Sequence, residues 1–144
     1  MEITIESARP DDVDAVLRLL DENELPREGW RDHLDTTVVA RRRGEVVGVA
    51  ALEMYQDGAL MRSVAVSPAL HGQGLGHQLT NAVLQLARDL DAPSAYLLTT
   101  TAAAFFPKFG FERVDRADVP GSVQASIEFA SACPSSAIVM RKTL

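Results

Sequence analysis

The sequence has one cysteine, 6% aromatic residues and no excess of positive charge. A lone thiol, Cys133, can neither form a disulfide within the chain nor supply a cluster of thiolate ligands, so we expect no disulfide framework and no metal site. The net charge of −6 at pH 7 argues against nucleic acid as a partner. The one basic run, Arg41–Arg43, precedes Gly44 and Glu45 and is typical of a solvated hairpin tip.

Long apolar runs are also missing. No stretch approaches the ~18 apolar residues of a membrane-spanning helix, and the opening MEITIESARP lacks a charged-then-apolar leader. We therefore expect a chain that is not a membrane protein and that resides in the cytoplasm. The remaining composition is ordinary for a globular protein, with 144 residues of which 47% are hydrophobic and 24% charged. This length suits one domain over residues 1–144, burying about 70% of its unfolded surface.

Hydrophobic periodicity predicts alternating strands and helices. Residues 3–8 alternate apolar and polar side chains, as a half-buried strand does, and residues 9–23 carry one apolar stripe, as an amphipathic helix does. Further helices are expected within 24–34, at 75–90, within 102–110 and at 122–133, and further strands at 36–42, 45–55, 59–66, 94–100, 111–114 and 135–144. This order predicts one mixed α/β domain whose early strands are antiparallel and whose later strands follow helical crossovers.

The strongest helix signal lies in residues 75–90. Apolar residues recur there four, four, three and four positions apart, which places them on one face of a helix. These residues are Leu75, Leu79, Val83, Leu86 and Leu90. We expect this face to be buried.

Three glycines at alternate positions, Gly72, Gly74 and Gly76, separate an apolar strand from this helix. Glycine is costly to order, so we expect the loop to bring several backbone N–H groups together at the helix amino terminus, where a phosphate binds. A Walker loop would need Lys and Ser or Thr after the last glycine, and the sequence has His-Gln. A dinucleotide fingerprint fails because His77 or Leu79 stands where its third glycine belongs. A plain strand-to-helix turn is the alternative.

The segment MRSVAVSPALHGQGLGHQL resembles the acetyl-CoA-binding segment of the GNAT superfamily of N-acetyltransferases. That pattern is an apolar strand ending in Ala-Val, a proline two residues on, and Arg/Gln-x-x-Gly-x-Gly/Ala opening a long helix. The sequence matches it at Ala65–Val66, Pro68 and 71–76, with His71 in place of the usual Arg or Gln. The element order and FFPKFGFERV also resemble this family. The resemblance implies a single-domain α/β fold, with a mixed central sheet of about six to seven strands, flanking helices and a splayed cofactor cleft.

The resemblance implies acetyl-CoA as the cofactor. The main chain of Val64–Val66 would pair with its pantetheine arm, and the N–H groups from His71 to Gly76 would hold its pyrophosphate. The thioester would lie where the strand at 59–66 separates from the strand at 94–100. The cofactor-binding residues expected on this basis are Val64, Ala65, Val66, His71, Gly72, Gln73, Gly74, Leu75, Gly76 and Phe106.

The family's usual general acid, a tyrosine four residues before the Gly-Phe pair, is missing. Phe106 occupies its position and has no proton to give, so we expect it to pack in the core. The run LLTTTAAAFFPKFGF instead resembles amino-acid N-acetyltransferases, and with the elements LMRS-AV, EF and CP-SA it resembles small N-acetyltransferases associated with arsenic resistance. In that subset a strand-end hydroxyl replaces the tyrosine, so Thr99 and Thr100 are candidates. A purely structural role for both threonines is the alternative.

The general base of the glutamate-acetylating relatives is also missing, because Leu60 stands at its position. If QDG at 56–58 forms a tight turn, Glu53 faces Arg62 across the hairpin, with Tyr55 on the same face. The hypothesis is that Glu53 takes the substrate proton through water while Arg62, beside Tyr55, recognises a substrate anion. The alternative is an ordinary cross-strand ion pair, worth about 0.2–1 kcal/mol.

The second helix is where this fold places the wall of the acceptor site, so His33 and Trp30 are candidate substrate-binding residues, with simple packing as the alternative for Trp30. His71 and His77 are expected at the surface. The sequence thus predicts an acetyl-CoA-dependent N-acetyltransferase of a small molecule that carries an amine and an anionic group, with an arsenic-containing amino acid as one candidate. A catalytically silent CoA-binding module and a peptide N-terminal acetyltransferase are the alternatives. Pairing of two copies through the last strands is expected from the family resemblance.

Overall fold

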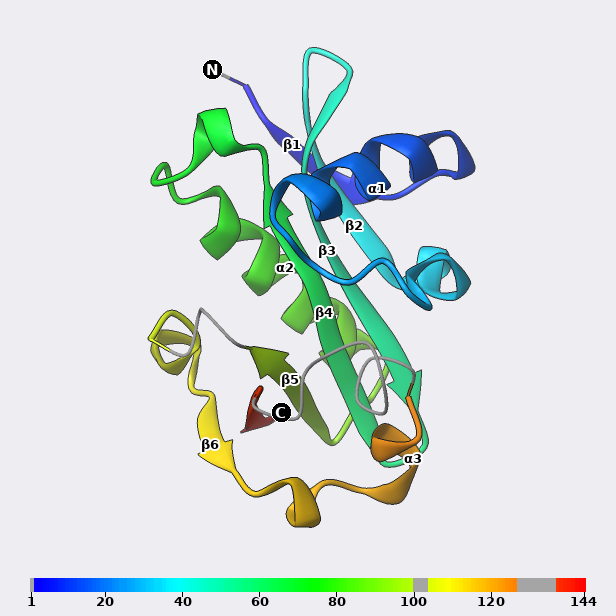
Figure 1. Ribbon diagram of the computed structural model, residues 1–144, viewed down its shortest axis with the longest axis vertical. Helices are drawn as coiled ribbons and strands as arrows, with labels where there is room; N and C mark the ends of the chain where they lie inside the picture. The colour runs from blue at the N-terminus through cyan, green and yellow to red at the C-terminus, as the bar shows by residue number, and fades with distance from the viewer. Residues whose placement is uncertain (1, 100–103, 127–136) are drawn as a thin grey trace.

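A computed structural model of the chain describes residues 2–99, 104–126 and 137–144 (Figure 1). Thr100, Cys133 and most of the helix expected at 122–133 lie outside the described residues. The strands are β1 (Thr4–Ser7), β2 (Thr37–Arg42), β3 (Glu45–Tyr55), β4 (Gly58–Val66), β5 (Ser94–Thr99), β6 (Glu112–Val114) and β7 (Ile138–Thr143). They form one sheet in the order β1-β2-β3-β4-β5-β7-β6, in which β4 and β5 are parallel and the other neighbours are antiparallel.

The helices of the described residues alternate with these strands in the predicted order. The α-helices are α1 (Val13–Glu22), α2 (Leu75–Asp89) and α3 (Gly121–Gln124), and the 3₁₀ helices are η1 (Pro10–Asp12), η2 (Trp30–Thr36), η3 (Pro68–Leu70), η4 (Phe106–Phe109) and η5 (Arg116–Asp118). The predicted short helices at 24–34 and 102–110 are the 3₁₀ helices η2 and η4. Within the described part of the chain, every helix is too short or too polar to cross a membrane.

The sheet is covered on both faces. α2 packs on one face, with Leu79 and Val83 fully buried against strand residues such as Leu52. α1 and η2 pack on the other face, where Leu20 and Trp30 are fully buried. Figure 1 shows α1 and α3 in front of the sheet and α2 behind it. Side-chain alternation along β3 and β4 therefore decides which residues meet α2 and which meet α1, η2 and α3.

The buried face of α2 is confirmed for most of the predicted residues. Leu75, Leu79 and Val83 are buried, and Leu86 packs against the same cluster. The prediction for Leu90 is wrong, because this side chain is 45% exposed. It follows the last residue of α2, so its direction no longer obeys the helical period.

The tip of the β2–β3 hairpin is the predicted two-residue turn. Arg43 and Gly44 have φ values of 53° and 81°, as a type I′ turn requires at both central positions. The prediction of a solvated tip is wrong for Arg41, which is 8% exposed. Its Nη1 donates to Oδ1 of Asp12 at 2.8 Å, and its Nε donates to Glu6. Strand alternation places Arg41 on the face that η1 and α1 cover, where Asp12 lies.

The β3–β4 register differs from the predicted one by two residues. Glu53 lies opposite Leu60, and Arg62 lies opposite Ala51, because Gly58 belongs to β4 and not to the turn. A Cβ on Gly58 would come within 2.9 Å of the Tyr96 ring, so this glycine permits a close approach of β5. A shift of two leaves every side chain on its original face. Glu53 and Arg62 therefore still share one face.

A β-bulge interrupts β4 at Ser63, which has a φ of 60°. Before the bulge Arg62 lies opposite Ala51, and after it Ala65 lies opposite Val49. The extra residue reverses the alternation, so Arg62 and Ala65 lie on the same face of the sheet although their spacing is odd.

The predicted separation of β4 from β5 is confirmed. Their parallel pairing joins Ala59 to Ala95 and Leu60 to Tyr96. Among the described residues no pairing joins the rest of β4, Met61–Val66, to Leu97–Thr99 of β5. The inner edge of β4 is thus left without a neighbouring strand at the point where the bulge begins.

Candidate active site

The loop between β4 and α2 has the geometry of an anion site. Gly72 and Gly74 have φ values of 81° and 82°, a region that side chains with a Cβ rarely adopt. Gly76 has no such constraint, and a Cβ there would come no closer than 3.8 Å to Phe105 and 3.9 Å to Val66. The chain's own packing therefore does not require glycine at 76. The space left beside it suits a ligand that approaches the backbone closely.

The amino terminus of α2 supplies the donors. Gly74 is its N-cap and makes no side-chain cap, and the backbone bond from Gln78 N to Gly74 O (3.2 Å) closes the first turn. The N–H groups of Leu75, Gly76 and His77 precede that bond and have no partner within the helix. Together with the positive end of the helix dipole, they make this terminus a candidate site for a phosphate group. The side chain of Leu75 itself is buried, so its contribution is its backbone.

The set of backbone N–H groups that could bind a phosphate is smaller than the predicted set, residues 71–76. The N–H of His71 already donates to Pro68 O at 3.3 Å. The His71 ring bends back, and its Nε2–H donates to the carbonyl of Val66 at 2.8 Å. Asn23, which follows α1, donates to the same carbonyl at 3.1 Å. The sequence gave no signal for Asn23. Gln73 is exposed on the loop, and Val64 is half-buried on β4.

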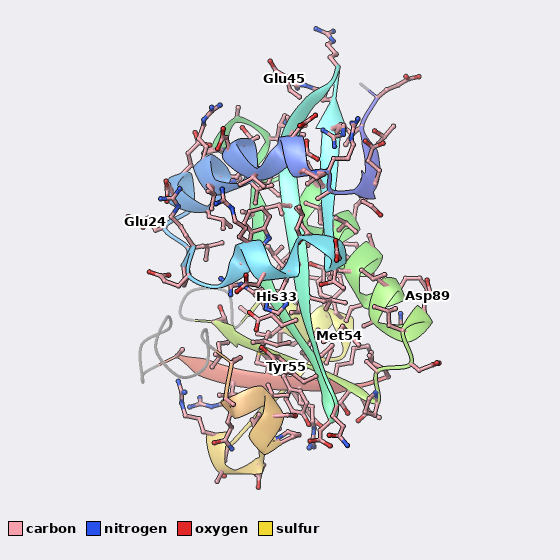
Figure 2. All side chains as sticks on the ribbon, turned by 90° about the vertical axis from the view of Figure 1, so that its right-hand side faces the viewer. Glu24, His33, Glu45, Met54, Tyr55 and Asp89 are labelled. Atoms are coloured by element: carbon pink, nitrogen blue, oxygen red, sulfur yellow. The ribbon has the colours of Figure 1, made fainter. Side chains whose placement is uncertain are left out.

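A cluster of four polar side chains lies on the sheet face between η2 and α3. Glu53 of β3 is 1% exposed, and its Oε2 accepts from Nη1 of Arg62 at 2.7 Å. The hydroxyl of Tyr55 donates to Oε1 of the same carboxylate. Nε2 of His33, on η2, is 3.4 Å from Oε1. Figure 2 labels His33 and Tyr55 in this region. The predicted grouping of Glu53, Tyr55 and Arg62 is confirmed, and His33 joins it.

Arg62 is held on several sides. Its side chain has 0% exposure. Besides the bond to Glu53, Nε donates to Oγ of Ser63 at 3.0 Å and Nη2 donates to the carbonyl of Pro26 at 3.2 Å. All three guanidinium nitrogens therefore already have acceptors. In this arrangement Arg62 is the partner of Glu53, and an incoming anion would have to replace one of these acceptors.

Tyr55 stays protonated in this cluster. Burial of the phenol raises its pKa above the ordinary value of 10.0, and the hydrogen bond to the Glu53 carboxylate raises it further. The hydroxyl is therefore a hydrogen-bond donor over the whole physiological range. Its role is to hold one oxygen of Glu53.

The other predicted residues are distributed around this cluster. Thr99 ends β5 and is 8% exposed, whereas Thr100 lies outside the described residues. Phe106 is buried between Phe105 and Phe111, with ring centroids 5.1 and 5.9 Å away, so its predicted core packing is confirmed. Its contact with the cofactor stays a prediction.

Trp30 is likewise a packing residue. Its side chain is fully buried, and its Nε1 donates to Oγ1 of Thr37 at 3.1 Å. The packing interpretation is confirmed, and the ring has no exposed surface with which to contact a substrate. Phe105 beside Gly76 is a neighbour of the loop that the sequence analysis missed, with Nζ of Lys108 lying 4.3 Å from its ring centroid.

The glycine loop and the separated strands define an acyl-CoA-binding fold, and comparison with known proteins identifies its family. A family model described as an acetyltransferase (GNAT) domain matches residues 33–113, so the chain belongs to the GNAT acetyltransferases. These are acyltransferases that use acetyl-CoA. The chain is 38% identical over 81 residues to an amino-acid acetyltransferase of Mycobacterium tuberculosis, covering 56% of the chain and 46% of that protein. It is 29% identical over 126 residues to the amino-acid acetyltransferase of Pasteurella multocida, covering 81% of the chain and 29% of that protein.

The chain thus spans less than half the length of these curated relatives. Among solved structures it is similar to Rv2747 from Mycobacterium tuberculosis in complex with CoA and NLQ, with a TM-score of 0.84, 27% identity and coverage of 98% of this chain and 99% of that one. It is also similar to N-acetylglutamate synthase from Neisseria gonorrhoeae complexed with coenzyme A and N-acetyl-glutamate. There the TM-score is 0.85, the identity 20%, and the coverage 100% of this chain and 35% of that one.

Proposed function

We propose that the protein transfers the acetyl group of acetyl-CoA to the primary amine of a small amino-acid-like substrate that also carries an anionic group. The observation that carries this proposal is the position of Glu53 directly opposite Leu60, beside the point where β4 leaves β5. Leu60 occupies the place of the base of the glutamate-acetylating enzymes that the sequence resembles, and the neighbouring strand supplies a carboxylate at the same level of the sheet. The names of the relatives, amino-acid acetyltransferases, support the substrate class.

The cofactor fits the residues present. Acetyl-CoA supplies an acetyl group activated as a thioester. The N–H groups of Leu75, Gly76 and His77 are the donors for its pyrophosphate, and the free edge of β4 suits an extended arm that bonds to main chain. The carbonyl of Val66 already accepts hydrogen bonds from His71 and Asn23. We therefore propose that the arm bonds mainly to residues of β4 that precede Val66.

The chemistry requires a neutral amine, stabilisation of the carbonyl oxygen and protonation of the leaving thiolate. We propose that the first requirement, a neutral amine, depends on Glu53. Its side chain is almost fully buried, so it acts through an intervening group, either water or a side chain. For the thiolate, the hydroxyls of Thr99 and Thr100 are the proposed donors, as members of the strand-end run that resembles amino-acid N-acetyltransferases.

The acceptor is proposed as an amino acid with an acidic or arsenic-containing side chain. Glutamate is the weaker candidate, because the glutamate-acetylating enzymes that the sequence resembles have paired arginines before the serine of the last strand, where this chain has Cys133–Ser135. The arsenic-containing candidate rests on the sequence resemblance. A free amino acid is favoured over a peptide by the names of the relatives, which are amino-acid acetyltransferases.

Release of free thiol from acetyl-CoA across a panel of amino acids, arsenical amino acids and short peptides tests the proposal. We expect turnover on at least one free amino acid. Activity on peptides alone would overturn the proposed acceptor class. Binding of acetyl-CoA without transfer to any amine would favour the CoA-binding module suggested by Phe106 and Leu60. The Glu53→Gln variant, assayed beside the wild type, should lose most of the turnover and keep its affinity for coenzyme A.

A further inference from the structure

We infer that His33 is the side chain that takes the proton from the substrate amine and that Glu53 positions it. This inference rests on the proposed amine acetylation and names the intervening group through which Glu53 acts. The proton thus passes to His33, a residue that the fold holds in place, and not to a water molecule. The inference also gives His33, expected from the sequence only as part of the substrate wall, a chemical role.

The first argument is that Glu53 is closed to a substrate. Its side chain is 2% exposed. One carboxylate oxygen is bound by Arg62 at 2.7 Å, and the other accepts from the hydroxyl of Tyr55. An amine can reach either oxygen only by displacing a donor that is itself held by the fold. Direct proton transfer from the substrate to Glu53 therefore does not suit this geometry.

The second argument is that His33 connects this carboxylate to the outside. Its side chain is 24% exposed, so part of it reaches solvent, and its Nε2 is 3.4 Å from Oε1 of Glu53. A carboxylate at this distance favours the proton on Nε2, which leaves Nδ1 with a free electron pair. Histidine changes charge between about pH 5 and 8, which suits the task of a general base.

The third argument is that the backbone of His33 is fixed. It departs from helical geometry inside η2, with φ −116° and ψ 25°. Its carbonyl accepts from Oγ1 of Thr37 at 2.8 Å and from Oγ1 of Thr36 at 3.3 Å. Thr37 in turn accepts from Nε1 of the fully buried Trp30. This chain of contacts sets the place from which the ring projects, as a preorganised catalytic group requires.

The charged surroundings of the ring come from three elements. β3 contributes Glu53 and Tyr55, and β4 contributes Arg62, whose charge is neutralised by Glu53. η2 itself contributes the exposed Asp32 and Asp35, and Arg31 precedes them. The Glu53 carboxylate contacts the ring, with its Oε1 3.4 Å from Nε2, and would compensate a positive charge that forms on the imidazole.

The proton balance follows from the reaction. Nδ1 of His33 takes one proton from the ammonium group, and the neutral amine gains a free electron pair. That pair forms the C–N bond to the acetyl carbon, and the C–S bond breaks with its electrons left on sulfur. The strand-end hydroxyl proposed above gives its proton to sulfur, which yields the free thiol, and takes a second proton from nitrogen in return. The first proton leaves His33 to solvent, and the amide keeps the last one.

The test compares His33→Gln with the matched control Asp32→Asn, which changes an exposed neighbour on the same 3₁₀ helix. With the amino acid that the wild type acetylates, we expect His33→Gln to lower kcat/KM about 100-fold or more and to remove the acid limb of its pH profile. The affinity for coenzyme A and the Tm should change little. Asp32→Asn should keep the wild-type profile. In His33→Ala, added imidazole should restore part of the lost rate.

A wild-type pH profile in His33→Gln, or no rescue of an inactive but folded His33→Ala by imidazole, would overturn the inference alone. Loss of activity in Asp32→Asn to the same degree would also overturn it, because the effect would then belong to η2 as a whole. If the wild type acetylates no amino acid, the proposed function fails and the inference fails with it. These outcomes are distinguishable because wild-type turnover is measured first.

Discussion

The carboxylate of Glu53 and the guanidinium of Arg62 are 2.7 Å apart, although the two residues are not opposite each other in the β3–β4 ladder. They meet diagonally, and both side chains are almost fully buried. The desolvation of two buried charges offsets much of their Coulomb attraction, so such a pair is weak evidence for stability. Its position beside the separated strands fits the role proposed for Glu53.

Removing one member of this pair should destabilise the fold far more than removing both. We expect Glu53→Leu to lower the free energy of unfolding by about 3–5 kcal/mol, because the Arg62 charge stays buried without its carboxylate. The double variant Glu53→Leu/Arg62→Met should recover most of this loss. Urea unfolding of the two variants and the wild type measures the difference. Equal losses in both variants would contradict a buried charge penalty.

Kinetic measurements distinguish two possible roles of Arg62, which are to hold Glu53 and to recognise the substrate anion. If it holds Glu53, as its buried position favours, Arg62→Met lowers kcat for an amino acid and for the corresponding amine without a carboxylate by the same factor. If it recognises the anion, the variant raises KM for the amino acid and leaves the simple amine unchanged. We expect the first result. Tyr55→Phe serves as the control, because it also removes a hydrogen-bond donor to Glu53 but leaves every charge in place.

Gly74 and Gly76 should respond differently to alanine. At Gly74 the φ of 82° is strained for any other residue, so Gly74→Ala should cost about 1 kcal/mol or more of stability. At Gly76 a Cβ meets nothing closer than 3.8 Å, so Gly76→Ala should keep the wild-type Tm. Its affinity for coenzyme A should also persist, because the family pattern admits alanine at this position, whereas the larger side chain of Gly76→Leu should lower that affinity by filling the space beside the N–H donors. Calorimetric titration checks this, and unchanged affinity in Gly76→Leu would remove the loop from cofactor binding.

Acid should weaken the anchor between β2 and the start of α1. The Arg41 guanidinium, by its hydrogen bond, lowers the pKa of Asp12 below the ordinary 3.8. A carboxyl group with a lowered folded pKa contributes stability that is fully present above its unfolded value and is lost as the pH falls through the folded value. Stability should therefore decline below about pH 4. In Asp12→Asn this part of the decline should be absent, as unfolding curves between pH 3 and 6 will show.

Much of the fold follows from local patterns. The element order was predictable because hydrophobic period and turn residues decide it, and the Arg43–Gly44 hairpin formed as expected. The register at Gly58 was not, since a glycine that makes room for Tyr96 resembles a turn glycine in sequence. Arg41 was missed because its acceptor, Asp12, is 29 residues away.

The site shows the same division. Glu53, Tyr55 and Arg62 could be grouped from the sequence because an even register error preserves the face of a strand. The approach of His33 to Glu53 depends on how η2 packs over β3, and no local pattern encodes that packing. The bonds from Asn23 and His71 to Val66 are tertiary in the same sense.

The bulge at Ser63 divides β4 into two halves that use opposite parity. Even-numbered side chains up to Arg62 lie on the face of the polar cluster, whereas Val64 and Val66 pack toward α2. The side chains proposed to recognise the acceptor and those beside the proposed donor site therefore lie on opposite faces of one strand. A single deletion at position 63 would restore regular alternation and leave each side chain on its present face, so the two halves differ in sequence parity and not in the face that they present.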